Sequence, residues 1–145
     1  MSVLNDPGVR DSLRFAWLES RPRTEDAHEE GGFVLRNVDG SIIVQRWPRG
    51  EKDQILVPSH VGGMRGSSLI LATFHTHPNI GQPYLQEPSM TDIRAVRDDP
   101  NLAHPEFEGE YVIGVDKVYV VRKNGQVDLF GETKVVLNMT ESKNA

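Results

Sequence analysis

Two histidines and one aspartate have the residue types and spacing to hold a single metal ion. His75 and His77 end a largely apolar run, and Asp92 follows a proline-rich loop. Side chains two residues apart on a strand point to the same face, so both imidazoles can reach one ion. Ser89 is predicted to open a helix, and Asp92, one turn into it, can direct its carboxylate back towards the strand. Two imidazoles and one carboxylate leave a fourth tetrahedral position for water, as catalytic zinc sites do.

Each part of this pattern also has a purely structural interpretation. A single histidine is usually an ordinary surface or core residue, and Ser89-x-x-Asp92 is also a capping box. The two interpretations of the serine and aspartate are compatible, because a capped helix N-terminus also positions Asp92. Other histidines are most simply solvent-facing or loop residues, and three alternating glutamates fit a solvated strand edge. These residues are His28, His60, His104, Glu106, Glu108 and Glu110.

The composition fits one globular domain without thiol chemistry. The chain has 145 residues, 37% of them hydrophobic, which suffices for one core but would be marginal for two. The absence of cysteine excludes a disulfide scaffold, a cysteine nucleophile and a thiolate zinc site. A formal net charge of −5 argues against nucleic acid as a partner. No apolar run approaches the roughly 20 residues that cross a membrane, and no secretory signal is visible, so we expect a cytoplasmic protein.

The elements that must position the candidate ligands alternate between strands and helices. Asp6 or Asn5 can cap a first helix that has Pro7 in its first turn, and a second helix runs from Ser89 to about Asp98. The run that ends in the two histidines is apolar on both faces, which is typical of a central strand. Strands interspersed with helices indicate one mixed sheet with helices packed on it. The predicted strands are 31–37, 41–47, 54–57, 68–77, 110–115, 117–122 and 126–130.

Together with an upstream acid, these segments resemble the signature of a known family. His-Thr-His-Pro at 75–78 and Ser-Met-Thr-Asp at 89–92 resemble the H-x-H…S-x-x-D motif of the JAMM (MPN+) zinc metalloproteases, prokaryotic branch. That family has an essential glutamate at the start of an upstream strand, and Glu29 lies in the matching place. The resemblance spans about 9–131, with a longer loop after the second histidine than is usual in the family.

The resemblance implies a fold as well as a reaction. The expected fold is a single-domain α/β structure, an α-β-α sandwich around a mixed sheet of the cytidine-deaminase-like (JAMM/MPN) type. It would cover residues 1–145, with a core at about 9–131 and a flexible C-terminal tail at 140–145.

The resemblance also implies a role for each site residue. Zn²⁺ would be held by His75, His77 and Asp92. Glu29 would act as general base towards a metal-activated water, and Ser89 would donate a hydrogen bond to the oxyanion.

The neighbouring acid, Glu30, is an alternative candidate for the general base. Strand alternation places Glu29 on the same face as Phe33 and Leu35, which is the more apolar face and therefore the one more suited to a covered site. We therefore favour Glu29, and Glu30 stays open as the alternative.

The expected function is that of a zinc-dependent metallopeptidase or isopeptidase that hydrolyses a peptide or isopeptide bond. Its expected partner is a polypeptide or protein conjugate, with a ubiquitin-like or other protein tag as one candidate, and no nucleic acid or membrane partner is expected. Two alternatives are a catalytically idle MPN-type interaction module and a zinc amidase acting on a cell-wall peptide or small amide. The sequence does not separate these substrates.

Overall fold

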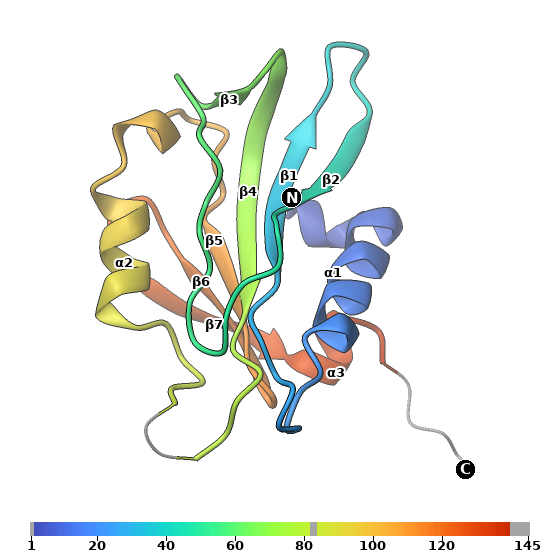
Figure 1. The fold of residues 1–145 in the computed structure, drawn as a ribbon. Coiled ribbons are helices and arrows are strands. Elements are labelled where there is room, and N and C mark those ends of the chain that lie inside the picture. The colour runs from blue at the N-terminus through green and yellow to red at the C-terminus, as the bar shows by residue number, and fades with distance from the viewer. Residues whose placement is uncertain (1, 82–83, 140–145) are drawn as a thin grey trace.

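A mixed β-sheet forms the centre of the molecule, seen in a computed structural model that describes residues 2–81 and 84–139 (Figure 1). The strand order is β2-β1-β4-β5-β6-β7, and a short β3 also pairs with β4. Only the β4–β5 pairing is parallel among the described strands. The strands are β1 (Gly31–Arg36), β2 (Ile42–Arg46), β3 (Met64–Arg65), β4 (Ser68–Thr76), β5 (Glu110–Ile113), β6 (Lys117–Val121) and β7 (Val127–Glu132).

Helices cover both faces of this sheet (Figure 1). Helix α1 (Pro7–Glu19) lies against one face, with the short α3 (Thr133–Val136) near its C-terminal end, and α2 (Met90–Arg97) covers the other face. Single 3₁₀ turns occur at Val3–Asn5 and Pro100–Leu102. The predicted α/β class with helices packed on a mixed sheet is confirmed. In the described part of the chain, no helix combines the length and apolar character needed to cross a membrane.

Two hydrophobic cores follow from this layering. On the α1 face, Leu13 and Trp17 of the helix pack with Val34 and Phe74 of the sheet. On the α2 face, Val96 belongs to a second core that also contains Phe33, Leu35 and Val112. Successive residues of β1 thus contribute to opposite cores, as the alternation of a strand requires.

The predicted positions of the main elements are confirmed. The Asp6 side chain caps α1 by accepting hydrogen bonds from the backbone of Gly8 and Val9, with Pro7 in the first turn. Strand β4 lies between β1 and β5 and is buried on both faces from Ile70 onward, as its continuous apolar sequence predicts. The predicted strands 31–37 and 41–47 form the hairpin β1–β2, and those at 117–122 and 126–130 form the hairpin β6–β7. The predicted flexible tail at 140–145 lies outside the described residues.

The predicted strand at 54–57 is wrong. That segment is an irregular stretch in which Ile55 packs on the α2-side core while Leu56 is 83% exposed. The short strand is β3 instead, which folds back on β4 through a tight turn at Gly66 and Ser67. Gly66 has a positive φ (62°), a conformation that other residues rarely adopt, and this turn makes the pairing of β3 with β4 possible.

The main chain at Gly31 lies so close to Trp47 that this position requires glycine. A Cβ atom at Gly31 would lie 2.6 Å from both the Phe74 carbonyl oxygen and the Trp47 ring. Trp47 is buried, and its ring contacts Phe33 edge to face, with 5.3 Å between centroids. The Gly-Gly pair after the two glutamates therefore lets Trp47 close the core beside the site described next.

Candidate metal centre

The end of β4 brings both predicted histidine ligands to the α2 face of the sheet. The Cα atoms of His75 pair with Gly31 in β1 and with Val112 in β5, so the His75 side chain shares its face with the α2-side core. His77 follows two residues later, and its Nε2 lies 3.1 Å from Nε2 of His75. Both imidazoles are buried. The predicted common face is confirmed.

The N-terminus of α2 brings in the aspartate. Ser89 Oγ accepts a hydrogen bond from the Asp92 backbone N–H (3.1 Å), and Asp92 Oδ2 accepts one from the Ser89 backbone N–H (2.8 Å). The predicted capping box is thus present. The same carboxylate faces the strand, with Oδ1 3.3 Å from His75 Nε2 and Oδ2 3.2 Å from His77 Nε2. Capping and metal binding are therefore compatible in one side chain.

The spacing of these three groups fits a metal ion. His75, His77 and Asp92 form a cluster of possible metal ligands in the structure. Their facing atoms are 3.1–3.3 Å apart. Ligand atoms at 2.0–2.2 Å around a tetrahedral zinc ion are about 3.3 Å from one another, so the separations here are of the size that a zinc site requires, with one Asp92 oxygen facing each imidazole. Two cavities, described below, reach this cluster.

The electrostatics of the cluster favour a positive charge at its centre. Burial acts to lower the pKa of His75, but Glu110 and Asp92 outweigh it and hold that pKa well above its usual value. Burial acts to raise the pKa of Asp92, but His75 and His77 outweigh it and keep that pKa far below its usual range. Without a metal, a proton on imidazole compensates the carboxylates, and a cation can replace that proton.

A glutamate that the sequence did not identify supports the first histidine. The carboxylate of Glu110, at the start of β5, accepts a hydrogen bond from Nδ1 of His75. Glu110 is buried, so its interpretation as part of a solvated strand edge is wrong. When a cation replaces the proton on Nε2 and Nδ1 stays bonded to Glu110, Nε2 would present its lone pair to the ion, which is the arrangement that metal-binding histidines adopt.

Removing the charge of Glu110 is expected to weaken metal binding. Partners behind a metal ligand typically contribute about 10–100-fold in affinity, so Glu110→Gln should bind zinc about 10–100-fold less tightly than the wild type. Competition with a chromophoric chelator measures this. Glu108→Gln is the matched control, because Glu108 bonds to Val3 and Tyr111 away from the site. Equal zinc affinity for Glu110→Gln and wild type would contradict the assigned role.

The other candidate residues lie outside the cluster. His60 contacts Asp99, and His104 contacts the Ile70 carbonyl oxygen. Glu106 forms an exposed ion pair with Arg36. The expectation that these histidines are not ligands agrees with their positions. His28 lies in a loop, as one of the two expected alternatives had it, but its side chain does not face solvent, because it is buried on the opposite face of the sheet.

Glu29 faces the cluster from the chain segment before β1. Its side chain is 6% exposed and, together with Asp92 and Ser89, it lines two cavities next to the histidines. Burial raises the pKa of Glu29 to about 7, although the nearby His75 opposes the shift. A carboxyl group with a pKa in this range can accept and release a proton near neutral pH.

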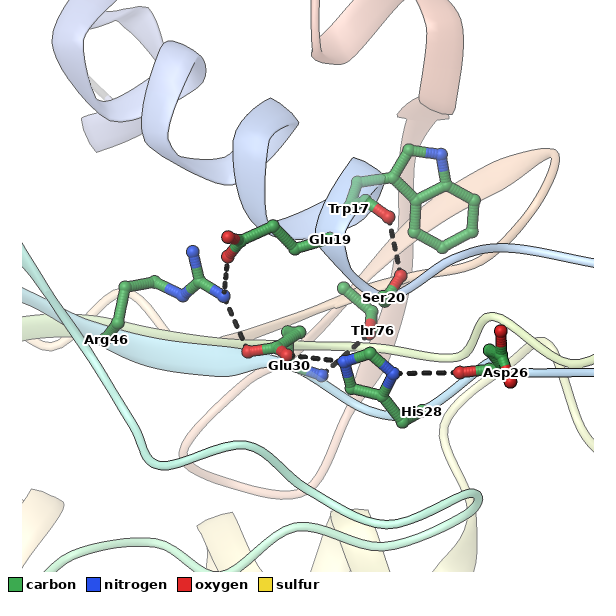
Figure 2. A network of polar contacts seen from close by, with 8 residues as sticks. All are labelled: Trp17, Glu19, Ser20, Asp26, His28, Glu30, Arg46 and Thr76. Carbon is green, nitrogen blue, oxygen red and sulfur yellow. Dashed lines mark hydrogen bonds and ion pairs between the residues drawn. The ribbon is translucent and has the colours of Figure 1, made fainter. Parts of the chain in front are cut away.

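Glu30 points to the opposite face of the sheet. It bonds to His28 and Arg46 on that face, and it is also 6% exposed (Figure 2). The two glutamates are therefore equally buried, and strand alternation rather than depth of burial separates them. The structure brings Glu29, and not Glu30, together with the predicted ligands.

Two cavities give access to the cluster. One of about 190 Å³ reaches His77, and another of about 250 Å³ reaches His75. Both are lined by Glu29, Asp53, Ser89 and Asp92. The loop after β4 contributes Asn79, Tyr84 and Leu85 to the first cavity. An extended molecule can therefore reach the open side of the cluster and the carboxyl group of Glu29 at once.

Comparisons of the chain with protein-family models, with curated proteins and with solved structures find no match. The assignment of function therefore depends on the geometry of the site.

Proposed function

We propose that the chain is a zinc-dependent metallopeptidase or isopeptidase of the JAMM (MPN+) type, which hydrolyses an amide bond with water. The observation that carries the proposal is the convergence of five groups on two cavities that share part of their lining. His75, His77 and Asp92 supply the ligand triangle, while Glu29 and Ser89 line the same cavities. The layered arrangement of α1, sheet and α2 supports the cytidine-deaminase-like sandwich as the fold type.

Each residue has a distinct task in this proposal. When bound, zinc supplies Lewis acidity, which polarises a carbonyl group and lowers the pKa of water to about 7. Glu29 accepts a proton from the attacking water and passes it to the leaving amine. Ser89 uses its oxygen to accept the Asp92 backbone N–H, so its own hydroxyl proton can be donated. The acceptor would be the carbonyl oxygen as it gains negative charge.

The intact set of groups favours an enzyme over an idle interaction module. A module that only binds partners has no need for a buried carboxyl group beside a ligand triangle, and burying Glu29 without a charge partner is costly. The substrate stays a prediction: a polypeptide or protein conjugate, including one with a ubiquitin-like tag, or a smaller amide. The cytoplasmic location and the absence of nucleic-acid and membrane partners also stay predictions.

A substrate panel tests the proposal. The zinc-loaded protein is incubated with ubiquitin-like conjugates, short peptides, cell-wall peptides and small amides, and the release of amine is measured. Turnover that stops on chelation and returns with zinc supports the proposal and identifies the substrate class. No turnover on any member of the panel would favour the binding module.

The hydroxyl group of Ser89 is expected to contribute about 10²-fold to turnover, which is the usual loss for one oxyanion donor. Ser89→Ala would also remove the cap of α2, so Ser89→Gly is the better variant, since glycine at this position costs only about a few tenths of a kcal/mol. Ser89→Thr keeps the hydroxyl and is the matched control. We expect Ser89→Gly to lose about 10²-fold in kcat and Ser89→Thr to retain most of it. Similar activity for the two variants would exclude the donor role.

A further inference from the structure

The residue between the two histidines connects the site to the opposite face of the sheet. Thr76 is completely buried, and its side chain points away from the face that carries His75 and His77. Its backbone N–H donates to the Glu30 carbonyl oxygen (2.9 Å), and its Oγ1 accepts from the Glu30 backbone N–H (3.0 Å). Two hydrogen bonds therefore join the peptide unit between the ligands to the residue that follows Glu29.

The second of these bonds departs from a regular ladder. Directly opposite residues in an antiparallel hydrogen-bonded pair exchange two main-chain bonds. At Glu30 the acceptor is a side-chain hydroxyl, because the chain is leaving the sheet one residue before β1 begins at Gly31. Thr76 therefore holds the chain at the point where Glu29 must turn into the cavity.

The main chain of Glu29 is fixed from its other side as well. Its N–H donates to the Glu51 carbonyl oxygen (2.7 Å), and its carbonyl oxygen accepts from the Gly50 N–H (2.9 Å). The peptide groups of two successive residues, Glu29 and Glu30, are therefore all hydrogen-bonded. The position of the Glu29 carboxyl group relative to the histidines follows from these contacts and from Thr76.

A buried polar network anchors Glu30 in turn (Figure 2). Glu30 Oε2 lies 2.6 Å from His28 Nε2, and Oε1 accepts from Arg46 Nη2 at 2.6 Å. Arg46 also reaches Glu19 at 2.9 Å, which ties the network to the end of α1. Nδ1 of His28 lies 2.9 Å from the Asp26 carbonyl oxygen.

The proton positions in this network follow from its partners. A carbonyl oxygen only accepts, so Nδ1 of His28 carries a proton. The 2.6 Å contact between Nε2 and the Glu30 carboxylate requires another proton between them. Both ring nitrogens of His28 therefore have a partner, and the contact with Glu30 has the length of a charge-assisted bond.

Burial of apolar surface is not what this polar network contributes to the stability of the sheet. The rest of the α1 face is covered by residues such as Leu13, Trp17 and Val34. A buried ion pair is often no more stabilising than apolar residues of similar volume, and its best-attested role is to specify one arrangement. The arrangement specified here is that of Glu30, whose main chain holds Thr76.

We propose that Thr76 is a positioning residue for the metal centre, anchored by Glu30, His28 and Arg46 behind the sheet. The Thr76 hydroxyl fixes the register between Glu29 and the two histidine ligands, although no atom of this network faces the cavity. The inference rests on the metal site of the proposed function, and it does not depend on which amide is the substrate.

The test compares Thr76→Val, which removes the acceptor at similar volume, with Thr76→Ser, which keeps it. Zinc affinity is measured by chelator competition, and the visible absorption of the cobalt-loaded protein reports ligand geometry. We expect Thr76→Val to bind zinc about tenfold less tightly, at the lower end of the usual effect of supporting contacts, and to change the cobalt spectrum. Thr76→Ser should retain the wild-type affinity and spectrum, even though loss of a buried methyl group lowers its stability.

A second pair of variants covers the case in which Thr76→Val does not fold. Glu30→Gln weakens the anchor at constant volume, and Glu108→Gln makes the same change in a partly buried glutamate away from the site. Only Glu30→Gln should alter the cobalt spectrum.

Two outcomes would overturn the inference, and they are distinguishable. If wild type binds zinc but Thr76→Val has the same zinc affinity and cobalt spectrum as Thr76→Ser, the positioning role is wrong and the proposed function stands. If Thr76→Val does not fold, the same conclusion follows when Glu30→Gln has the same cobalt spectrum as Glu108→Gln. If folded wild type binds neither zinc nor cobalt, the proposed function fails and the inference fails with it.

Discussion

Glu29→Gln is expected to lower turnover by about 10²–10⁴-fold while zinc stays bound, because general acid–base catalysis typically contributes that much. The amide of glutamine is close in size to the carboxyl group but cannot take a proton from water and return it to an amine. Glu29 is not one of the three residues in the ligand cluster, so its replacement should leave metal binding in place. The measurement is kcat on a substrate from the panel, with zinc content determined for each variant.

Glu30→Gln is not a suitable control for this experiment. A control residue should face solvent, but the Glu30 side chain is buried and bonded to His28 and Arg46. Removing one partner of a buried ion pair typically lowers the free energy of unfolding by about 3–5 kcal/mol. Loss of activity in Glu30→Gln would therefore have to be corrected for the folded, zinc-loaded fraction.

Glu106→Gln is a cleaner comparison for Glu29→Gln. Its side chain is exposed and pairs only with Arg36 on the surface, and such pairs are usually worth about 1 kcal/mol or less. We expect its kcat to equal that of the wild type. Turnover by Glu29→Gln at the wild-type rate would end the proposed mechanism. If Glu29→Gln turns over at the normal rate and Glu30→Gln loses most of its turnover per folded molecule, the general base is Glu30 and not Glu29.

The parts of the site that could be predicted from the sequence are those set by local periodicity. His75 and His77 share a face because they are two residues apart on a strand, and Glu29 shares that face by the same alternation. Ser89 and Asp92 are placed by the capping of one helix, which depends on four consecutive residues. These features need no knowledge of how the strands are ordered.

The features that the sequence did not predict depend on pairing between distant segments. Glu110 reaches His75 because β4 and β5 are parallel neighbours in a register that pairs Glu110 with Thr73. The alternation of Glu106, Glu108 and Glu110 does not by itself separate Glu110 from the other two. A sequence signal could have been the β-branched and aromatic run that follows Glu110, which places it at the start of a buried strand.

The burial of His28 and Glu30 and the irregular course of 54–57 have the same origin. Arg46 of β2 and the end of α1 cover the two polar residues, and both contacts join segments that are distant in the sequence. Gln54–Val57 has the composition of a strand, but within the described residues it pairs with no strand of the sheet. Local propensity could not reveal that this segment finds no pairing partner.

Replacing any one of the three metal ligands should cause near-complete loss of bound zinc and of zinc-dependent turnover. We expect this for His75→Ala, His77→Ala and Asp92→Ala, because each removes one of the three ligand side chains of the cluster. Elemental analysis after gel filtration measures the zinc content. His60→Ala is the control, since His60 contacts Asp99 outside the cluster and should leave a full equivalent of zinc in place.

The three variants should differ in the stability of the metal-free protein, and this difference tests the site independently of activity. His75→Ala leaves the buried Glu110 without its imidazole partner, a change that typically costs about 3–5 kcal/mol. His77 has no carboxylate behind its Nδ1 among the described residues, so His77→Ala should cost less. Circular dichroism must show that each variant is folded, because metal binding can itself contribute folding energy. Retention of a full equivalent of zinc by folded His77→Ala and Asp92→Ala proteins would show that the ion is bound elsewhere.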